Sequence, residues 1–138
     1  MSTSFFLAPI DPNFWFTEAN AGQKPDCDLH IDPDWYRAEL LKKWPLAKVS
    51  RSGSEHYVLF WTLDSEDGPG PEGDLQADCQ HVSFTYSTPT FEEFIRWHRG
   101  LIPEKYTLYL FNSSSAPRHL VVTASTTSDE IENYLMHS

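Results

Sequence analysis

Four residues with metal-binding side chains stand in two short pairs, Cys27 with His30 and Cys79 with His81. Thiolates and imidazoles are the usual ligands of zinc, which needs four such donors in one place. The spacings here differ from the usual pair of cysteines followed by a pair of histidines. The sequence therefore favours two separate thiols and two surface histidines, with a zinc site as the alternative.

The second candidate for chemistry is a stretch of acids, glycines and prolines over residues 64–74. Its acids alternate before Gly68, as they do in a calcium loop, but the third and twelfth ligand positions of that motif are not filled. The two prolines of the stretch would also keep the chain from wrapping around an ion. We expect a flexible, solvated loop, and docking to a basic partner is its second interpretation. The acids concerned are Asp64, Glu66, Asp67, Glu72 and Asp74.

Trp97 and His98, flanked by Arg96 and Arg99, are the side chains most suited to line a pocket. His98 falls on the apolar stripe of a predicted helix, where a single histidine is usually a core or boundary residue. An imidazole among aromatic rings would titrate near neutral pH and could act as an acid, a base or a switch. We expect a structural His98, and a binding site at Trp97 and His98 is the alternative.

Two pairs of neighbouring acids have the composition of a general acid and base: Glu92 with Glu93, and Asp129 with Glu130. Each pair follows a threonine, so each segment fits a capping box, in which the threonine and the glutamate satisfy each other's backbone amides. Acids also suit the positive end of a helix dipole. Both pairs are therefore predicted to start helices. The sequence has no nucleophile elbow, phosphate-binding loop or dinucleotide-binding pattern, and no catalytic residue is predicted.

Three helices are expected from apolar residues that recur at three- and four-residue spacing. The first begins at Asp32 and Pro33, which suit the N-cap and the first helical position, and it ends at Pro45. The second begins at the first capping box and is limited by Gly100 and Pro103. The third begins at the second capping box and is shorter.

Apolar runs and alternation predict strands at residues 56–63, 75–86, 106–111 and 119–123, with a further short strand at residues 4–8. The loops between them favour antiparallel pairing. The fold class expected is α+β, a mainly antiparallel sheet of four to five strands with about three helices over one face. Residues 56–63 are apolar on both faces and are therefore expected at the centre of the sheet.

The second half of the chain shows the order strand, strand, helix twice. One interpretation is a ββα pseudo-repeat, and the other is two unrelated hairpins that each precede a capped helix. The second face of the sheet needs a cover, because residues 56–63 are apolar on both sides. An arm at residues 5–16, which contains three consecutive aromatic residues, could supply it, and so could a second copy of the chain.

The 138 residues are expected to form a single domain over residues 1–138, with residues 1–31 as an irregular N-terminal arm. The 20 acidic and 10 basic side chains give a formal net charge of −10. This charge disfavours nucleic acid and anionic membranes as partners and permits a basic protein. The sequence has no signal peptide and no apolar run of ~18 residues, and two cysteines suit reduced thiols. We therefore expect a soluble, cytoplasmic protein.

Trp35 and Arg37 are separated by one residue, and Pro45 and a predicted strand follow them in the chain. In this the chain resembles small acidic α+β domains of bacteria, among them toxin-neutralising immunity proteins, and the resemblance implies no particular site residues. We expect an acidic interaction module, an inhibitor or immunity-like partner of a basic protein that needs no cofactor. The alternatives are a small enzyme or sensor, with a pocket near Trp97 and His98 or a Cys/His metal site, and a self-assembling subunit that forms a homodimer.

Overall fold

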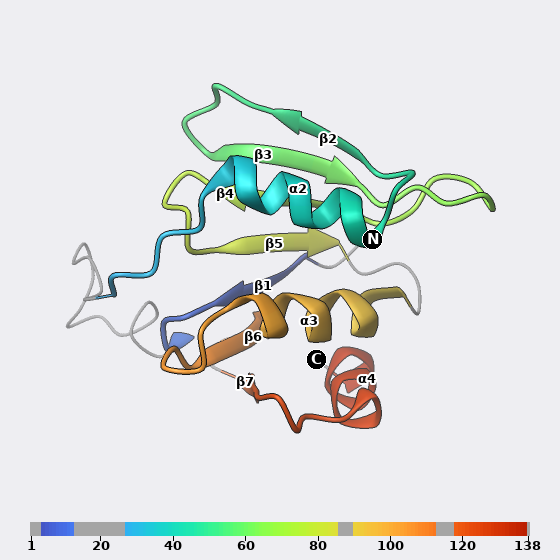
Figure 1. Cartoon of the computed structure of the whole chain (residues 1–138). Coiled ribbons are helices and arrows are strands. Elements are labelled where there is room, and N and C mark those ends of the chain that lie inside the picture. Colours follow the sequence, from blue (N-terminus) through green and yellow to red (C-terminus); the bar gives the residue numbers. More distant parts are fainter. Residues whose placement is uncertain (1–3, 13–26, 86–89, 113–117, 138) are drawn as a thin grey trace.

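A computed structural model describes residues 4–12, 27–85, 90–112 and 118–137 of the chain. These residues form a seven-stranded antiparallel sheet with helices over one face (Figure 1). In chain order the elements are β1 (Ser4–Ala8), α2 (Pro33–Lys43), β2 (Lys48–Arg51), β3 (Tyr57–Thr62), β4 (Glu72–Gln76), β5 (Val82–Thr85), α3 (Thr90–Leu101), β6 (Leu108–Asn112), β7 (His119–Val122) and α4 (Ser128–His137). The strand order across the sheet is β2-β3-β4-β5-β1-β6-β7.

The α+β class and the antiparallel sheet are confirmed, but the expected number of four to five strands is wrong. β2 was not predicted because its sequence, KVSR, has no apolar alternation. The predicted strand at residues 75–86 is two strands, β4 and β5, which a turn separates. In that turn Asp78 Oδ1 accepts from the amides of Gln80 and His81 at 2.9 and 3.0 Å. Cys79 between them adopts a left-handed backbone conformation, with φ of 57°.

The places of two strands within the sheet also differ from expectation. β3 lies beside the edge strand β2 and not at the centre. β1, which lies within the predicted irregular arm, is a strand between β5 and β6, and its Phe5 and Leu7 are 1 % and 0 % exposed. Phe5 lies opposite Phe84 of β5 and Asn112 of β6. These partners are far away in the chain, so no local sequence pattern indicates them.

The core fills the space between the sheet and the helices, which Figure 1 shows over the same face. Leu59 and Trp61 of β3 are buried in it, whereas Phe60 between them is half-buried on the other face. Tyr36 of α2 packs on Trp61 with ring centroids 5.6 Å apart, and Phe94 of α3 packs on the same indole at 6.0 Å. Burying such a side chain stabilises the fold by roughly 1.5–3 kcal/mol. Aromatic contacts therefore tie the helices to the sheet.

The helices begin close to the predicted positions. α2 follows Asp32, whose carbonyl accepts from Tyr36 N at 2.9 Å, although the Asp32 side chain makes no capping bond. α3 ends at Leu101, before Pro103. Within the described residues, no helix combines the length and apolar character needed to cross a bilayer. The three consecutive aromatic residues at 14–16 lie outside the described residues.

Candidate functional site

The β3–β4 hairpin carries the acids of residues 64–74. Figure 1 shows the connection between β3 and β4 reaching beyond the end of the sheet. Its backbone is folded back on itself, because Ser65 and Gly68 exchange two backbone hydrogen bonds of 3.0 Å. Closer to the sheet, Leu63 N donates to Pro71 O at 2.9 Å. The stretch predicted as a flexible loop thus forms the end of a hairpin, and its flexibility stays a prediction.

Two glycines allow this path. Gly68 has φ of 123°, in the left-handed region that side chains rarely adopt. A Cβ atom on Gly70 would lie 1.7 Å from Leu63 O, so no other residue fits there without moving the backbone. The predicted loop also ends earlier than expected, because β4 begins at Glu72, which pairs with Thr62 of β3.

The five candidate acids of this stretch do not share one environment. Asp64 Oδ1 accepts from Gly70 N at 3.2 Å, and its Oδ2 lies 3.7 Å from Lys48 Nζ. Asp64 therefore holds the hairpin together. Three other acids are exposed and form no ion pair within the described part of the chain, so their charges are available to a partner. They are Glu66, Asp67 and Glu72.

Asp74 points away from the helices. Its neighbours Gly73 and Leu75 are buried toward the core, and Asp74 lies opposite Phe60 and Ser83 on the other face of the sheet. Burial raises the pKa of the Asp74 carboxyl, and a hydrogen bond with the Ser83 side chain partly opposes the rise. Asp74 is thus a half-buried sheet residue and lies apart from the exposed acids of the hairpin.

His98 is fully enclosed between α3 and α2. Its Nδ1 lies 2.8 Å from Tyr36 Oη, and its ring stacks on Phe94 with centroids 6.2 Å apart. Burial, together with the charge of Arg99, lowers the pKa of His98 to about 3. A pKa this low argues against the alternative in which His98 titrates near neutral pH, because the apolar surroundings exclude the imidazolium. A neutral, enclosed imidazole cannot serve as acid or base for a ligand at the surface.

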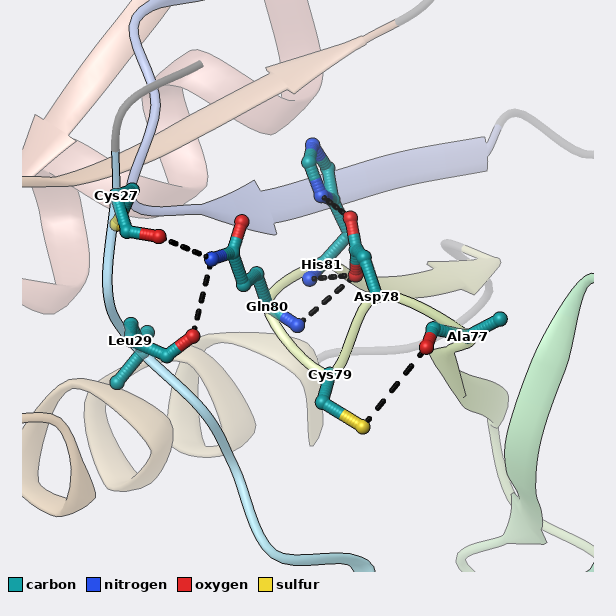
Figure 2. Close-up of polar contacts among 7 residues, drawn as sticks. All are labelled: Cys27, Leu29, Ala77, Asp78, Cys79, Gln80 and His81. Carbon is teal, nitrogen blue, oxygen red and sulfur yellow. Dashed lines mark hydrogen bonds and ion pairs between the residues drawn. The ribbon is translucent and has the colours of Figure 1, made fainter. Parts of the chain in front are cut away.

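Figure 2 shows the candidate metal ligands of the β4–β5 turn. His81 Nδ1 donates to Asp78 Oδ2 at 2.6 Å, and the Cys79 thiol points to Ala77 O, 3.9 Å away, on the other side of the turn. Burial alone would raise the pKa of Asp78, but hydrogen bonds from His81 and its charge lower it to about 2. Burial and the Asp78 charge raise the pKa of the Cys79 thiol. The thiol thus stays protonated and apart from the imidazole.

The other Cys/His pair lies beside that turn. Gln80 Nε2 donates to the carbonyls of Cys27 and Leu29 at 2.9 and 3.0 Å, which Figure 2 shows as two dashed lines from one amide. His30 is exposed. Among the residues that the structure describes, no group of three or more His, Cys, Asp or Glu side chains could hold a metal ion. Backbone carbonyls, and not thiols, therefore join residues 27–31 to the turn.

The acids at the two helix starts have different partners. At α4, Thr127 N donates to Glu130 Oε1 and Glu130 N donates to Thr127 Oγ1, both at 3.1 Å, which is the predicted capping box. At α3, Glu93 Oε1 lies 2.7 Å from Lys43 Nζ of α2, and the side chain of Thr90 lies outside the described part of the chain. Glu93 and its neighbour Glu92 line a groove along α3.

This groove, which we call the α3 groove, has a volume of about 610 Å³ and runs from the end of α2 to the turn that follows β7. Trp97 forms part of its wall, whereas His98 does not line it. An adjoining cavity of about 360 Å³ continues it past Tyr106. The charged side chains that line the α3 groove are Lys43, Glu92, Glu93, Arg96, Arg99 and Glu104.

A pocket near Trp97 and His98, with Arg96 and Arg99 beside them, was the alternative expected from the sequence, but the contributions of α2 and of the turn after β7 were not predicted. Lys43 reaches the groove from α2, and no local pattern links it to Glu93. The burial of Arg99 also has no counterpart in the sequence, because an arginine in the last turn of a helix is usually exposed. One indication was available, since Gly100 lies inside a predicted helix where a better helix former is usual.

The described surface thus offers an acidic hairpin and a groove with mixed charges, while the Cys/His pairs and His98 are held by contacts of their own. Comparisons of the chain with models of protein families, with curated proteins and with solved structures find no match. The candidate sites are therefore defined by their geometry and charge.

Proposed function

We propose that this chain is a non-catalytic binding module that captures a basic protein through the β3–β4 hairpin, as an inhibitor or immunity-like partner does. The observation that carries the proposal is the set of exposed carboxylates on Glu66, Asp67 and Glu72, which form no ion pair within the described residues. They lie on a hairpin whose backbone bonds are already made. Such preorganisation favours binding because less conformational freedom is lost.

The overall charge supports the same proposal. The chain carries 20 acidic and 10 basic side chains, so a basic partner is attracted from a distance. The cation that pairs with the hairpin, Lys48, contacts Asp64 and leaves the other hairpin carboxylates uncompensated. Charges of this kind increase the association rate and make it depend on salt. We expect binding to be fast and to weaken as the salt concentration rises.

The enzyme or sensor alternative draws less support from the geometry. His98 is enclosed and holds a low pKa, so it lacks both access and the charge change that a switch near neutral pH needs. The Cys79 thiol and the His81 imidazole point to opposite sides of their turn (Figure 2). Neither pair thus presents the shared donors that metal chemistry needs.

Two further proposals concern the architecture. A duplicated ββα unit is supported by the order β4, β5, α3 and β6, β7, α4, because each helix follows an antiparallel strand pair. A homodimer is supported by the half-buried Phe60 on the face of the sheet away from the helices. Light scattering tests the second proposal, since a monomer at high concentration would remove it.

The test of the binding function compares two triple variants that reduce the net negative charge equally. Immobilised poly-lysine serves as the cationic probe, and its binding is measured over a range of salt concentrations. The substitutions are Glu66→Gln, Asp67→Asn and Glu72→Gln in the hairpin variant, and Glu55→Gln, Asp129→Asn and Glu132→Gln in the control variant, whose exposed acids lie elsewhere.

We expect the hairpin variant to bind poly-lysine more weakly and with a smaller salt dependence than the control variant. The reason is that each ion pair formed with the probe releases counterions, so fewer contacts give a flatter salt dependence. If both variants show the same salt dependence, the hairpin has no special role and the proposal is wrong.

A further inference from the structure

Two adjoining cavities form the hollow that begins with the α3 groove. The larger one extends from Lys43 to Thr123, and the smaller one continues from there along Tyr106. Arg99 lines both cavities. The charge state and hydrogen bonds of Arg99 therefore decide what the groove can hold.

Arg99 is a buried cation that binds neutral groups. It is 7 % exposed, and its Nη1 donates to the carbonyls of Tyr106 and Val122 at 3.0 and 3.5 Å. Its Nη2 donates to the carbonyls of Ile102 and Pro103 at 2.9 and 3.0 Å. No carboxylate forms an ion pair with it in the described part of the chain. This is unusual, because a buried arginine is normally paired with an anion.

One donor of Arg99 remains. Its Nε–H has no hydrogen-bond partner among the described residues. In the same part of the chain, His98 Nε2 is the one fully buried side-chain nitrogen or oxygen without a partner, so Arg99 Nε keeps contact with solvent. A guanidinium N–H that is still accessible is a good donor to a carboxylate or phosphate oxygen.

Arg96 adds a second positive charge to the groove. It is three residues before Arg99, so both side chains lie on the same side of α3. Its Nη1 donates to Ser128 Oγ at 3.1 Å, which is a neutral partner. Lys43 differs, because Glu93 already neutralises it at 2.7 Å. Within the described ranges of the chain, Arg96 and Arg99 are thus without a carboxylate contact.

Gly100 leaves room beside these cations. It lines the groove within α3, and a Cβ atom at this position would meet nothing within 4 Å. Packing therefore does not require a glycine here, and a side chain could be added at this edge of the groove without a clash. The missing side chain keeps the space next to Arg96 and Arg99 open.

We propose that the α3 groove binds a small molecule through an oxyanion, a carboxylate or a phosphate, which Arg96 and Arg99 hold while Trp97 provides an apolar wall. Glu104 lines the same groove and lies too far from Arg99 for an ion pair, so its carboxylate competes with the ligand for the positive charge. The groove shares no residue with the hairpin, and this inference does not depend on the proposed function.

The experiment titrates the full chain with inorganic phosphate and, separately, with acetate at constant ionic strength. Backbone amide resonances report the binding, and the amides of residues 96–104 and 123–125 are expected to shift. Tighter binding of phosphate would identify the ligand's oxyanion as a phosphate group, and tighter binding of acetate would identify it as a carboxylate. Arg37→Gln is the matched control, because Arg37 is an exposed arginine of α2 outside the groove.

Three variants give distinct expected results. Gly100→Gln fills the groove without a clash and abolishes binding, and Arg96→Gln weakens it about tenfold through the loss of one charge-assisted contact. Glu104→Gln strengthens binding because it removes the competing carboxylate. Arg37→Gln leaves binding unchanged.

The proposal is overturned if neither anion shifts the groove amides at millimolar concentrations. It is also overturned if Gly100→Gln binds like the unmodified chain, or if Arg37→Gln weakens binding as much as Arg96→Gln does. The last result would mean that anions respond to net charge alone. The hairpin variant is expected to bind phosphate or acetate no worse than the unmodified chain, so a failure here is distinct from a failure of the hairpin proposal.

Discussion

Helices α3 and α4 begin with the same pattern, a threonine followed three residues later by a glutamate, but the two glutamates do different things. Glu130 and Thr127 bind each other's backbone amides at 3.1 Å and close the first turn of α4. Glu93 of α3 pairs with Lys43 at 2.7 Å and lines the α3 groove. The end of α2 brings a lysine to the first turn of α3, whereas Glu130 has no ion pair within the described residues.

The comparison teaches that a capping pattern predicts where a helix begins better than it predicts what its acid binds. Both helices begin where the pattern places them. At α3 a lysine from another helix reaches the acid, and the acid lines the wall of a groove. The contacts of an acid at a helix start therefore depend on tertiary neighbours as well as on its own first turn.

The largest expected effect on the free energy of unfolding comes from truncating the buried side chain that follows each glutamate. Phe94 follows Glu93, and its ring contacts those of Trp44, Trp61, Phe84, Trp97 and His98. Ile131 follows Glu130 and is equally buried. We expect Phe94→Ala to lower the free energy of unfolding by about 3–5 kcal/mol and Ile131→Ala by a smaller amount within the range of about 2–5 kcal/mol. Urea denaturation measures both, and a larger loss for Ile131→Ala would contradict the central place of α3.

The second prediction concerns the position eight residues after each threonine, which is His98 in α3 and Leu135 in α4. The folded state lowers the pKa of His98 from 6.5 to about 3, so between these values the unfolded chain binds one more proton. The neutral, buried His98 side chain makes its full contribution to the free energy of unfolding above pH 6.5, and this contribution is lost as the pH falls below that value. We expect the free energy of unfolding to drop by about 1.4 kcal/mol per pH unit between pH 6.5 and 5.

The control for this prediction replaces the buried polar pair with apolar residues. Tyr36→Phe with His98→Leu removes both hydrogen-bonding partners, so no buried group is left unpaired. We expect this double variant to lose most of the pH dependence between pH 5 and 6.5, whereas His56→Asn, at an exposed histidine, should retain it. A double variant with the full pH dependence would show that another group causes it.

The third prediction tests the capping box of α4. Thr127→Ala removes the hydroxyl that accepts from Glu130 N, and we expect a loss of about 1 kcal/mol in the free energy of unfolding. Thr127→Ser keeps the hydroxyl and should retain most of the stability. Urea midpoints of the two variants provide the measurement, and equal losses would mean that the hydroxyl does not cap the helix.

The smallest expected effect is that of Glu93→Gln in α3. The Lys43–Glu93 pair is about half exposed, with side chains 40 % and 52 % accessible, and such pairs contribute roughly 0–1 kcal/mol. We expect a change below about 0.5 kcal/mol in the free energy of unfolding. A loss as large as that of Thr127→Ala would mean that Glu93 contributes more to stability than an exposed ion pair does.

Much of the local structure could be predicted from the sequence. The helix starts at Asp32 and Thr127 have recognisable N-cap sequences, although of the two only Thr127 makes a side-chain capping bond, and strand β7 coincides with a predicted apolar run. The number of strands could not be predicted from the sequence, because β2 has too few apolar residues and the β4–β5 turn lies within an apparently continuous strand. The place of β1 between β5 and β6 rests on distant partners that periodicity does not encode.

The candidate sites were predictable to a smaller extent. The acidic stretch was identified from composition, but the separation of Asp64 and Asp74 from the exposed acids required the hydrogen bonds and the sheet register. His98 was correctly placed on an apolar face, and its low pKa follows from an enclosure that sequence spacing cannot measure. The α3 groove joins side chains from α2, α3 and the turn after β7, so only the folded chain brings them together.

The most direct test of the binding function is a map of backbone amide resonances during titration with a short lysine peptide. The account predicts that the largest shifts occur at residues 65–67 and 72 of the hairpin, where the unpaired carboxylates lie. It would be contradicted by shifts spread evenly over all exposed acids, or centred on the acids of α4, with the hairpin unaffected.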